Sequence, residues 1–173
     1  MIWLISDERN DAVLKSALNN LPRGSGFIFR HYHLTQAERR QRFKALARLA
    51  RRFDHVVVVA GTAKQARRWG ADGAYGSPHQ LARGPDCLRL TAVHSLREIG
   101  AAQRARADAV LLSPVFQTRS HAGATSLGTV RFLMIARQSG LPVIALGGMT
   151  PHRADQLSGH GWAAIDGLYG KTR

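Results

Sequence analysis

A glycine-rich segment near the end of the chain has the residue types that bind a phosphate group. In Gly147-Gly148-Met149-Thr150-Pro151, two glycines let a ligand approach the backbone, and Thr150-Pro151 is typical of a helix start with free N–H groups. Gly167, with Leu168 beside it, is placed to add further N–H donors. We therefore predict an anion site here. The alternative is that Gly147-Gly148 only permits a tight turn.

A polar loop from Ser113 to His121 is the second candidate. Thr118 and Ser120 supply hydroxyl groups, and His121 beside Arg119 supplies cationic or hydrogen-bonding groups. Such a loop can close over an anion, and we expect Phe116 to pack on a ligand ring. The alternative is an ordinary polar surface loop.

Two further candidates each end a β-type run. Arg30 follows GFIF and can hold a phosphate or carboxylate, or pair with a neighbouring acid. His94 follows CLRLTAV and is a candidate acid–base group, although a lone histidine is more often a hydrogen-bonded structural residue. Asp7 and Asp166 are the only carboxylates expected at strand ends. Asp166 can accept a proton or pair with an arginine, and we favour the pairing, so a magnesium site built from two carboxylates has little support.

The elements that position these residues alternate between β-type runs and helical patterns. Strands are expected near residues 2, 26, 55, 73, 88, 109, 142 and 162, with the sixth covering 108–116. The apolar run HVVVVA at 55–60 is typical of a strand buried on both faces. A helix over 35–53 has an apolar stripe and a capping box at its start, and another helix should run from Thr150-Pro151 to Gly159.

This alternation predicts an α/β fold, the closed (β/α)8 TIM barrel, as a single domain over residues 1–173. Functional sites then lie at the C-terminal ends of the strands. The segment 77–87 cannot hold a full helix, so we expect a compact barrel with one crossover helix reduced or missing. An open doubly wound sheet is the alternative.

Composition limits the partners. The chain has 25 Lys and Arg against 11 Asp and Glu among 173 residues, a net charge of +14, which raises nucleic acid as a partner. On helix 35–53, however, most basic residues oppose the apolar stripe without interleaved aromatics, which favours a solvated face. No apolar run approaches the ~20 residues of a membrane-spanning helix. With one cysteine, Cys87, and no secretory signal at the start, we expect a cytoplasmic location and no membrane partner.

Three segments together resemble the thiamine phosphate synthase and thiazole tautomerase family. They are GADGAYGS (70–77), AVHSLREIGAAQRARADAVLLSPVFQT (92–118) and LPVIALGGMTPHRADQL (141–157). The resemblance spans about residues 26 to 170 and implies a (β/α)8 barrel that binds a thiazole phosphate in its mouth. In the family, a Gly-Gly loop and N–H groups after the last strand hold the phosphate, at positions that match Gly147, Gly148 and Gly167.

The reactive positions of the synthases differ here. Their second strand ends in Gln-x-Arg-x-Lys, which corresponds to Ile28-x-Arg30-x-Tyr32. Their third strand ends in Asn-Asp, which serves the magnesium diphosphate, and this chain has Ala60-Gly61. Their Thr-x-Thr-Lys diphosphate loop corresponds to Thr118-Arg119-Ser120-His121. Of these groups, the arginine and one threonine are retained.

The resemblance implies a thiamine-biosynthesis protein whose nominal activity condenses a thiazole phosphate with a pyrimidine diphosphate. Mg²⁺ is expected only if synthase activity is retained, and no other cofactor is expected. One alternative is a tautomerase-like isomerase, in which His94 or His121 would replace the acid–base histidine that corresponds to Pro114. Others are a non-catalytic binder or regulator and, less favoured, a nucleic-acid binder. Whether the chain is an enzyme or a homodimer stays open.

Overall fold

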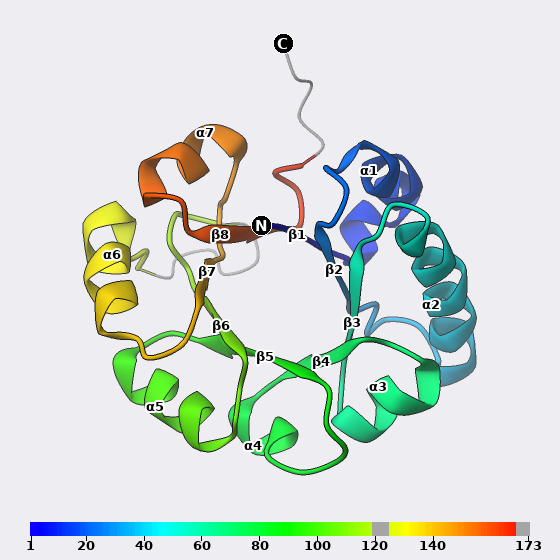
Figure 1. Cartoon of the computed structure of the whole chain (residues 1–173). Helices are drawn as coiled ribbons and strands as arrows, with labels where there is room; N and C mark the ends of the chain where they lie inside the picture. Colours follow the sequence, from blue (N-terminus) through cyan, green and yellow to red (C-terminus); the bar gives the residue numbers. More distant parts are fainter. Residues whose placement is uncertain (119–124, 169–173) are drawn as a thin grey trace.

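Eight parallel strands close into a barrel in the computed structural model, which describes residues 1–118 and 125–168 (Figure 1). Each strand pairs with the next, and β8 returns to β1 with Leu4 opposite Ala164. The predicted TIM barrel is confirmed, and the open doubly wound sheet is wrong. The strands are β1 (Ile2–Ile5), β2 (Gly26–Phe29), β3 (Val56–Ala60), β4 (Gly73–Gly76), β5 (Leu88–Val93), β6 (Ala109–Leu112), β7 (Val143–Ala145) and β8 (Gly161–Ala164).

Helices surround the barrel on its outside (Figure 1). α4 has only four residues, so the predicted reduction of one crossover helix between 77 and 87 is confirmed. None of the helices in the described part of the chain has the length and apolar composition to cross a membrane. They are α1 (Leu14–Asn20) after the 3₁₀ helix η1 (Glu8–Val13), α2 (Gln36–Arg51), α3 (Ala63–Trp69), α4 (Pro78–Leu81), α5 (Leu96–Arg104), α6 (Gly128–Gln138) and α7 (Pro151–Ala154) before the 3₁₀ helix η3 (Asp155–Leu157).

Two predicted elements are shorter than expected. The strand expected over 108–116 ends at Leu112, because Pro114 has no N–H to continue the ladder. Val115 and Phe116 instead donate their N–H groups to the loop after β7. The helix expected to reach Gly159 is α7 plus the short η3, and the chain then turns through left-handed backbone at Ser158 and Gly159.

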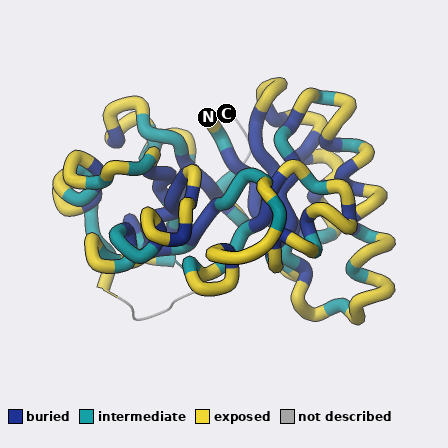
Figure 2. Tube along the Cα trace, turned by 60° about the horizontal axis from the view of Figure 1, so that its bottom comes forward, coloured by how far each residue is buried: buried dark blue, intermediate teal, exposed yellow. Residues whose placement is uncertain are grey.

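Apolar residues fill both sides of the strand layer. Inward-facing side chains from alternating strand positions, among them Trp3, Leu111 and Ile144, form the cluster inside the barrel. Outward-facing side chains pack under the helices, whose exposed faces form the outer surface in Figure 2. On α2 the predicted stripe is buried at Phe43, Leu46, Ala47 and Ala50, whereas the basic residues Arg40, Lys44, Arg48 and Arg51 are exposed.

Two aspartates join neighbouring strands at the end of the barrel opposite the predicted site. Asp72, just before β4, accepts the Val57 N–H on its side chain at 2.7 Å and donates its own N–H to the Val57 carbonyl. Asp108, just before β6, makes the same two bonds with Arg89. Each carboxylate therefore satisfies a strand-end N–H that the ladder alone leaves unpaired.

Asp72→Ala should lower the melting temperature, because the buried Val57 N–H loses its acceptor. Such a loss costs about 1–3 kcal/mol, or roughly 2–10 °C for a domain of this size. Asp72→Asn keeps a carbonyl acceptor and should lose less. Asp108→Ala is the matched comparison, and its melting temperature should also fall less than that of Asp72→Ala, because the Arg89 contact is exposed. Circular dichroism melts test this ranking, and an unchanged melting temperature for Asp72→Ala contradicts it.

Candidate functional site

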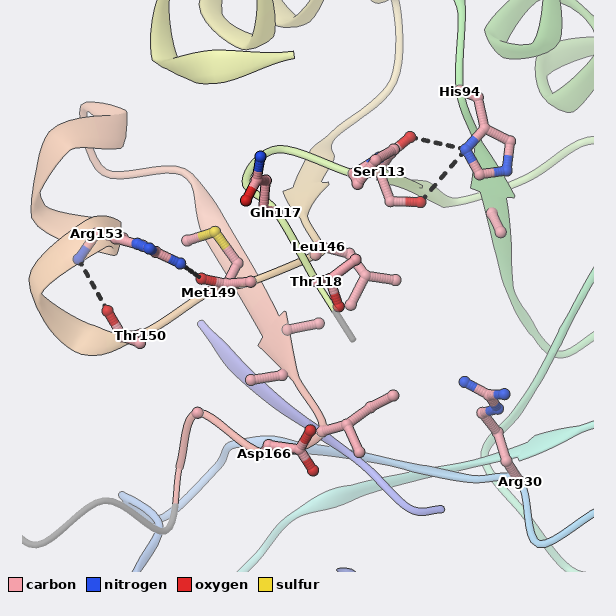
Figure 3. A pocket seen from close by; sticks show the side chains of 18 of the residues that line it. Arg30, His94, Ser113, Gln117, Thr118, Leu146, Met149, Thr150, Arg153 and Asp166 are labelled. Carbon is pink, nitrogen blue, oxygen red and sulfur yellow. Dashed lines mark hydrogen bonds between the residues drawn. The ribbon is translucent and has the colours of Figure 1, made fainter. Parts of the chain in front are cut away.

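A cavity of about 840 Å³ opens at the C-terminal ends of the strands, where the barrel fold predicts the site (Figure 3). Most of the residues predicted to form the site line this one cavity. Those that do are Arg30, His94, Thr118, Gly147, Gly148 and Gly167, and they are joined there by Tyr32, Tyr75, Ser113, Gln117, Arg153 and Asp166. Ser120 and His121 lie outside the described residues.

The three glycines are required by the packing of loops against one another. Gly147 and Gly148 have φ of 96° and 62°, a left-handed backbone that favours glycine. A Cβ on Gly147 would lie 2.7 Å from the Pro114 Cα, and one on Gly148 would overlap the Gln117 carbonyl oxygen. A Cβ on Gly167 would overlap the Met149 carbonyl oxygen. Loop packing therefore requires glycine at these three positions by itself, and the approach of a ligand to their backbone stays a prediction.

The same loops nevertheless carry backbone N–H donors on residues that line the cavity. Within the described ranges, no acceptor is found for the backbone N–H groups of Gly148, Met149 and Gly167, and all three residues line the cavity. Backbone N–H groups that converge without an acceptor are a common way of binding an anion. These three N–H groups are the candidate donors of the predicted anion site, which stays a prediction.

The charge beside these donors comes from Arg153, which the sequence reasoning missed. Helix α7 is only four residues long, so few peptide dipoles align and the helix itself adds little positive charge. Arg153 donates to the Gly148 carbonyl oxygen, and its Cζ lies 4.9 Å from the centre of the Phe116 ring. The sequence could have indicated Arg153, because Thr150-Pro151 fixes the first helical turn and residue 153 lies within that turn.

Phe116 and Leu168 pack away from the cavity lining. Both are partly buried hydrophobic residues that contact the cluster beneath α5, α6 and η3. The Phe116 ring also lies against the Arg153 guanidinium. Phe116 therefore supports Arg153 in this structure, and whether it also meets a ligand ring stays a prediction.

Arg30 lies at the cavity, where it could bind an anion, and also pairs with an acid; these were the two alternatives predicted for it. Its Nη2 lies 3.7 Å from an Asp7 carboxylate oxygen, its Cζ lies 5.4 Å from the centre of the Tyr32 ring, and it lines the cavity. Its Nε is buried and has no hydrogen-bond partner among the described residues. Burial raises the Asp7 pKa, but hydrogen bonds and charge from Arg9 and the charge of Arg30 outweigh it, so the pKa is lowered and Asp7 stays ionised.

His94 is held as a hydrogen-bonded residue. Its Nδ1 donates to the Ser113 carbonyl oxygen at 2.7 Å (Figure 3). Its backbone N–H donates to Glu98. In the neutral ring this leaves only Nε2 without a proton.

On the opposite side Asp166 lies 3.4 Å from Arg9, which confirms the predicted pairing with an arginine. Tyr75, which the sequence reasoning also missed, has its pKa raised by burial and keeps its hydroxyl proton.

The residues at the ends of β2 and β3 do not fit a magnesium site. The Arg39 guanidinium donates to the carbonyl oxygens of Arg30 and Ala60, both at 2.6 Å. A cation thus covers the strand ends where a metal would need carboxylate ligands. The nearby carboxylates of Asp7 and Asp166 both pair with Arg9. Across residues 1–118 and 125–168, no three His, Cys, Asp or Glu side chains are grouped to hold a metal ion.

Comparison with known proteins places this barrel in a family. The family model for thiamine monophosphate synthase matches residues 2–167, and the chain belongs to that family. The "Putative thiamine-phosphate synthase 2" of Aquifex aeolicus is 28% identical over 134 residues, covering 74% of this chain and 67% of the relative. The "Thiamine-phosphate synthase" of Halalkalibacterium halodurans is 24% identical over 125 residues, covering 68% of this chain and only 59% of the relative.

The fold has a close counterpart among solved structures. The thiamine phosphate pyrophosphorylase of Pyrococcus furiosus superposes with a TM-score of 0.80 at 24% identity, covering 95% of this chain and 84% of that one. At this identity the likeness supports the barrel and its strand order. The assignment of ligands rests on the residues in the cavity.

Gly148→Ala should destabilise the barrel more than Gly159→Ala. Both glycines have positive φ, which costs another residue about 1–2 kcal/mol. A Cβ on Gly159 meets nothing within 4 Å, whereas one on Gly148 overlaps the Gln117 carbonyl oxygen. Thermal melts of the two variants separate backbone strain from loop contact. Equal melting temperatures would show that loop contact is not what requires glycine at 148.

Proposed function

We propose that this chain, as a single barrel domain over residues 1–173, binds a thiazole phosphate in the mouth of the barrel. The phosphate group lies on the N–H groups of Gly148 and Gly167, beside the guanidinium of Arg153. The observation that carries the proposal is one cavity lined both by Arg153 and by residues whose N–H groups have no acceptor in the described part of the chain. Phosphate oxygens accept hydrogen bonds from both kinds of donor, and a charged donor makes them stronger.

The cavity has the size and the charge for this class of ligand. Its volume of about 840 Å³ falls within the range of pockets that bind drug-sized molecules, about 300–1,000 Å³. Arg153 lies in α7, which follows β7, and Arg30 directly follows β2, with Arg30 drawn across the cavity from Arg153 in Figure 3. A phosphate at Arg153 leaves Arg30 for a second negatively charged group. Family membership supports a role in thiamine biosynthesis and a phosphorylated substrate.

For the nominal condensation, the second negatively charged group is the diphosphate of a pyrimidine. Arg30 would then offset the charge that collects on the departing diphosphate, which is the part of a transition state that a fixed cation stabilises most. The cavity would hold the two reactants together, so that their encounter is no longer bimolecular.

A binder or regulator without turnover is the second candidate function. The observation that favours it is Arg39, whose guanidinium covers the ends of β2 and β3. The tautomerase alternative has less support, because Pro114 stands at the family's acid–base position and His94 has only Nε2 free to accept a proton. Both alternatives use the same phosphate site.

Arg153→Met should weaken binding of thiazole phosphate about 10-fold or more, because the phosphate loses a charge-assisted donor worth about 1.5–3 kcal/mol. Binding of the unphosphorylated thiazole alcohol should not change. Titration calorimetry measures both affinities. The matched control is Arg137→Met on the exposed face of α6, which should bind like the parent. Equal losses for both thiazoles, or no loss for either, would contradict the assignment of Arg153.

Affinity for thiazole phosphate should be the same in magnesium and in EDTA, because the described residues beside the phosphate site include no group of carboxylates placed to hold a metal. Product analysis with a pyrimidine diphosphate, in both conditions, then separates the two candidate functions. Formation of thiamine phosphate above the uncatalysed rate supports the synthase. Tight binding without product supports the binder. Binding of thiazole phosphate that requires magnesium would contradict the metal-free site.

A further inference from the structure

A line of polar side chains, buried at Ser6 and His31, runs beneath Arg30. The Arg30 N–H donates to the Ser6 Oγ at 2.8 Å, and the same Oγ lies 2.8 Å from the His31 Nδ1. The His31 Nε2 lies 2.6 Å from the Asp11 Oδ1, which also accepts from the Arg42 Nε at 2.9 Å. The line thus starts at α2 and η1 near the surface and ends at the backbone of a cavity residue.

Only one arrangement of protons satisfies this line when His31 is neutral. The Arg30 N–H can only donate, so the Ser6 oxygen accepts from it. The ionised Asp11 carboxylate can only accept, so the His31 Nε2 carries a proton and donates it. The bare His31 Nδ1 then accepts the Ser6 hydroxyl proton. Every contact has one donor and one acceptor, so the position of each group constrains the next.

The line holds a backbone conformation that the sequence does not favour by itself. His31 is buried and has φ of 44°, in the left-handed region that costs a residue other than glycine free energy. Its ring stacks on Phe29 at 4.7 Å. Because Arg30 precedes His31, this turn sets the direction in which the chain leaves β2. Arg30 itself retains a buried Nε without a partner among the described residues.

We propose that Ser6, His31 and Asp11 are positioning residues that hold Arg30 toward an anionic group in the barrel mouth. The inference rests on the proposed function, because it takes Arg30 to meet the second negatively charged group. If the line only closed the ends of β1 and β2, its loss would lower stability and leave the affinity of the folded protein unchanged.

The protonation state of His31 agrees with this arrangement. Burial lowers the His31 pKa, and this outweighs the raising effect of Asp11 on η1. The other charged or titratable groups that act on it are His33, in the loop after β2, and Arg42 on α2, and both lower the pKa further. His31 is therefore neutral in the folded protein near pH 7, as the donor order requires.

The parent protein should lose stability as the pH falls below about 6.5, the ordinary histidine pKa, because His31 binds a proton more readily unfolded than folded. The loss should continue until the lowered pKa of the folded state is passed. His31→Asn should lack this part of the pH dependence. Asp7 and Asp11, whose pKa values are lowered from 3.8, act only below that pH in both proteins. Melting temperatures from pH 8 to pH 4.5 test the difference, and identical slopes would contradict the neutral assignment.

A double-mutant cycle between Ser6 and Arg30 tests the proposal directly, with inorganic diphosphate as the probe. Ser6→Ala should weaken diphosphate binding about five-fold or more in the parent, and should have no further effect in an Arg30→Met background. His31→Asn keeps an acceptor near the Nδ1 position and tolerates the left-handed backbone, so it should restore most of the affinity that His31→Ala loses. Titration calorimetry gives the affinities, and melting temperatures are recorded beside them.

The controls separate the positioning role of the polar line from the role of Arg30 itself. Ser16→Ala, on the exposed side of α1, should leave diphosphate binding unchanged. Asp11→Ala breaks the line near the surface and replaces Ser6→Ala if the latter does not fold. The positioning role is overturned if Ser6→Ala lowers stability without lowering diphosphate affinity. It is also overturned if Ser6→Ala lowers that affinity equally in the parent and in the Arg30→Met background. Unchanged affinity in Arg30→Met alone overturns the role of Arg30 and the inference with it, whereas the thiazole phosphate site at Arg153 is tested separately.

Discussion

Closure of the strand layer is the constraint on which the rest of this structure depends. The ladder is complete only when β8 returns to β1, and this brings the C-terminal ends of all eight strands around one mouth. The crossovers are short, with four residues in α4 and four in α7, so the loops have little room. The loops after β6, β7 and β8 therefore lie against one another, and glycine is required where their backbones meet.

The crowding of these loops also creates the chemistry of the mouth. These loops pack through carbonyl oxygens and side chains. The N–H groups of Gly148 and Gly167, two residues that line the cavity, have no acceptor among the described residues. Arg9 pairs with both Asp7 and Asp166, so the acids at the strand ends add little free negative charge. Arg30 and Arg153 then dominate the charge of the cavity. The larger basic surface on α2 lies outside the barrel and follows from an exposed helix face.

The strands, the capped helices and the reduced crossover could be predicted from the sequence, because they depend on neighbouring residues. Apolar runs such as 55–60 predict buried strands, and Thr35, Thr62 and Thr150 each cap the helix that follows. The cavity could be placed because the fold class fixes which strand ends meet. Pro114 was the exception among the strands, since one missing N–H ended a run that otherwise favours β structure.

The partners of individual side chains could not be predicted, because they depend on the register and on loops far apart in the sequence. Nothing local to His31 shows that it is buried between Ser6 and Asp11. The glycine pair could be predicted, but its physical reason, contact with the loop after β6, required the structure. Arg39 reaches the carbonyl of Ala60, 21 positions away, and so changes what the ends of β2 and β3 can bind.

The most direct measurement is an amide ¹H–¹⁵N correlation spectrum of the protein during titration with thiazole phosphate, with the unphosphorylated thiazole as reference. The account predicts that the amides of Gly148, Met149 and Gly167 show the largest shifts, and that these shifts require the phosphate group. Shifts confined to the basic face of α2, or the same shifts with both thiazoles, would contradict a phosphate site in the barrel mouth.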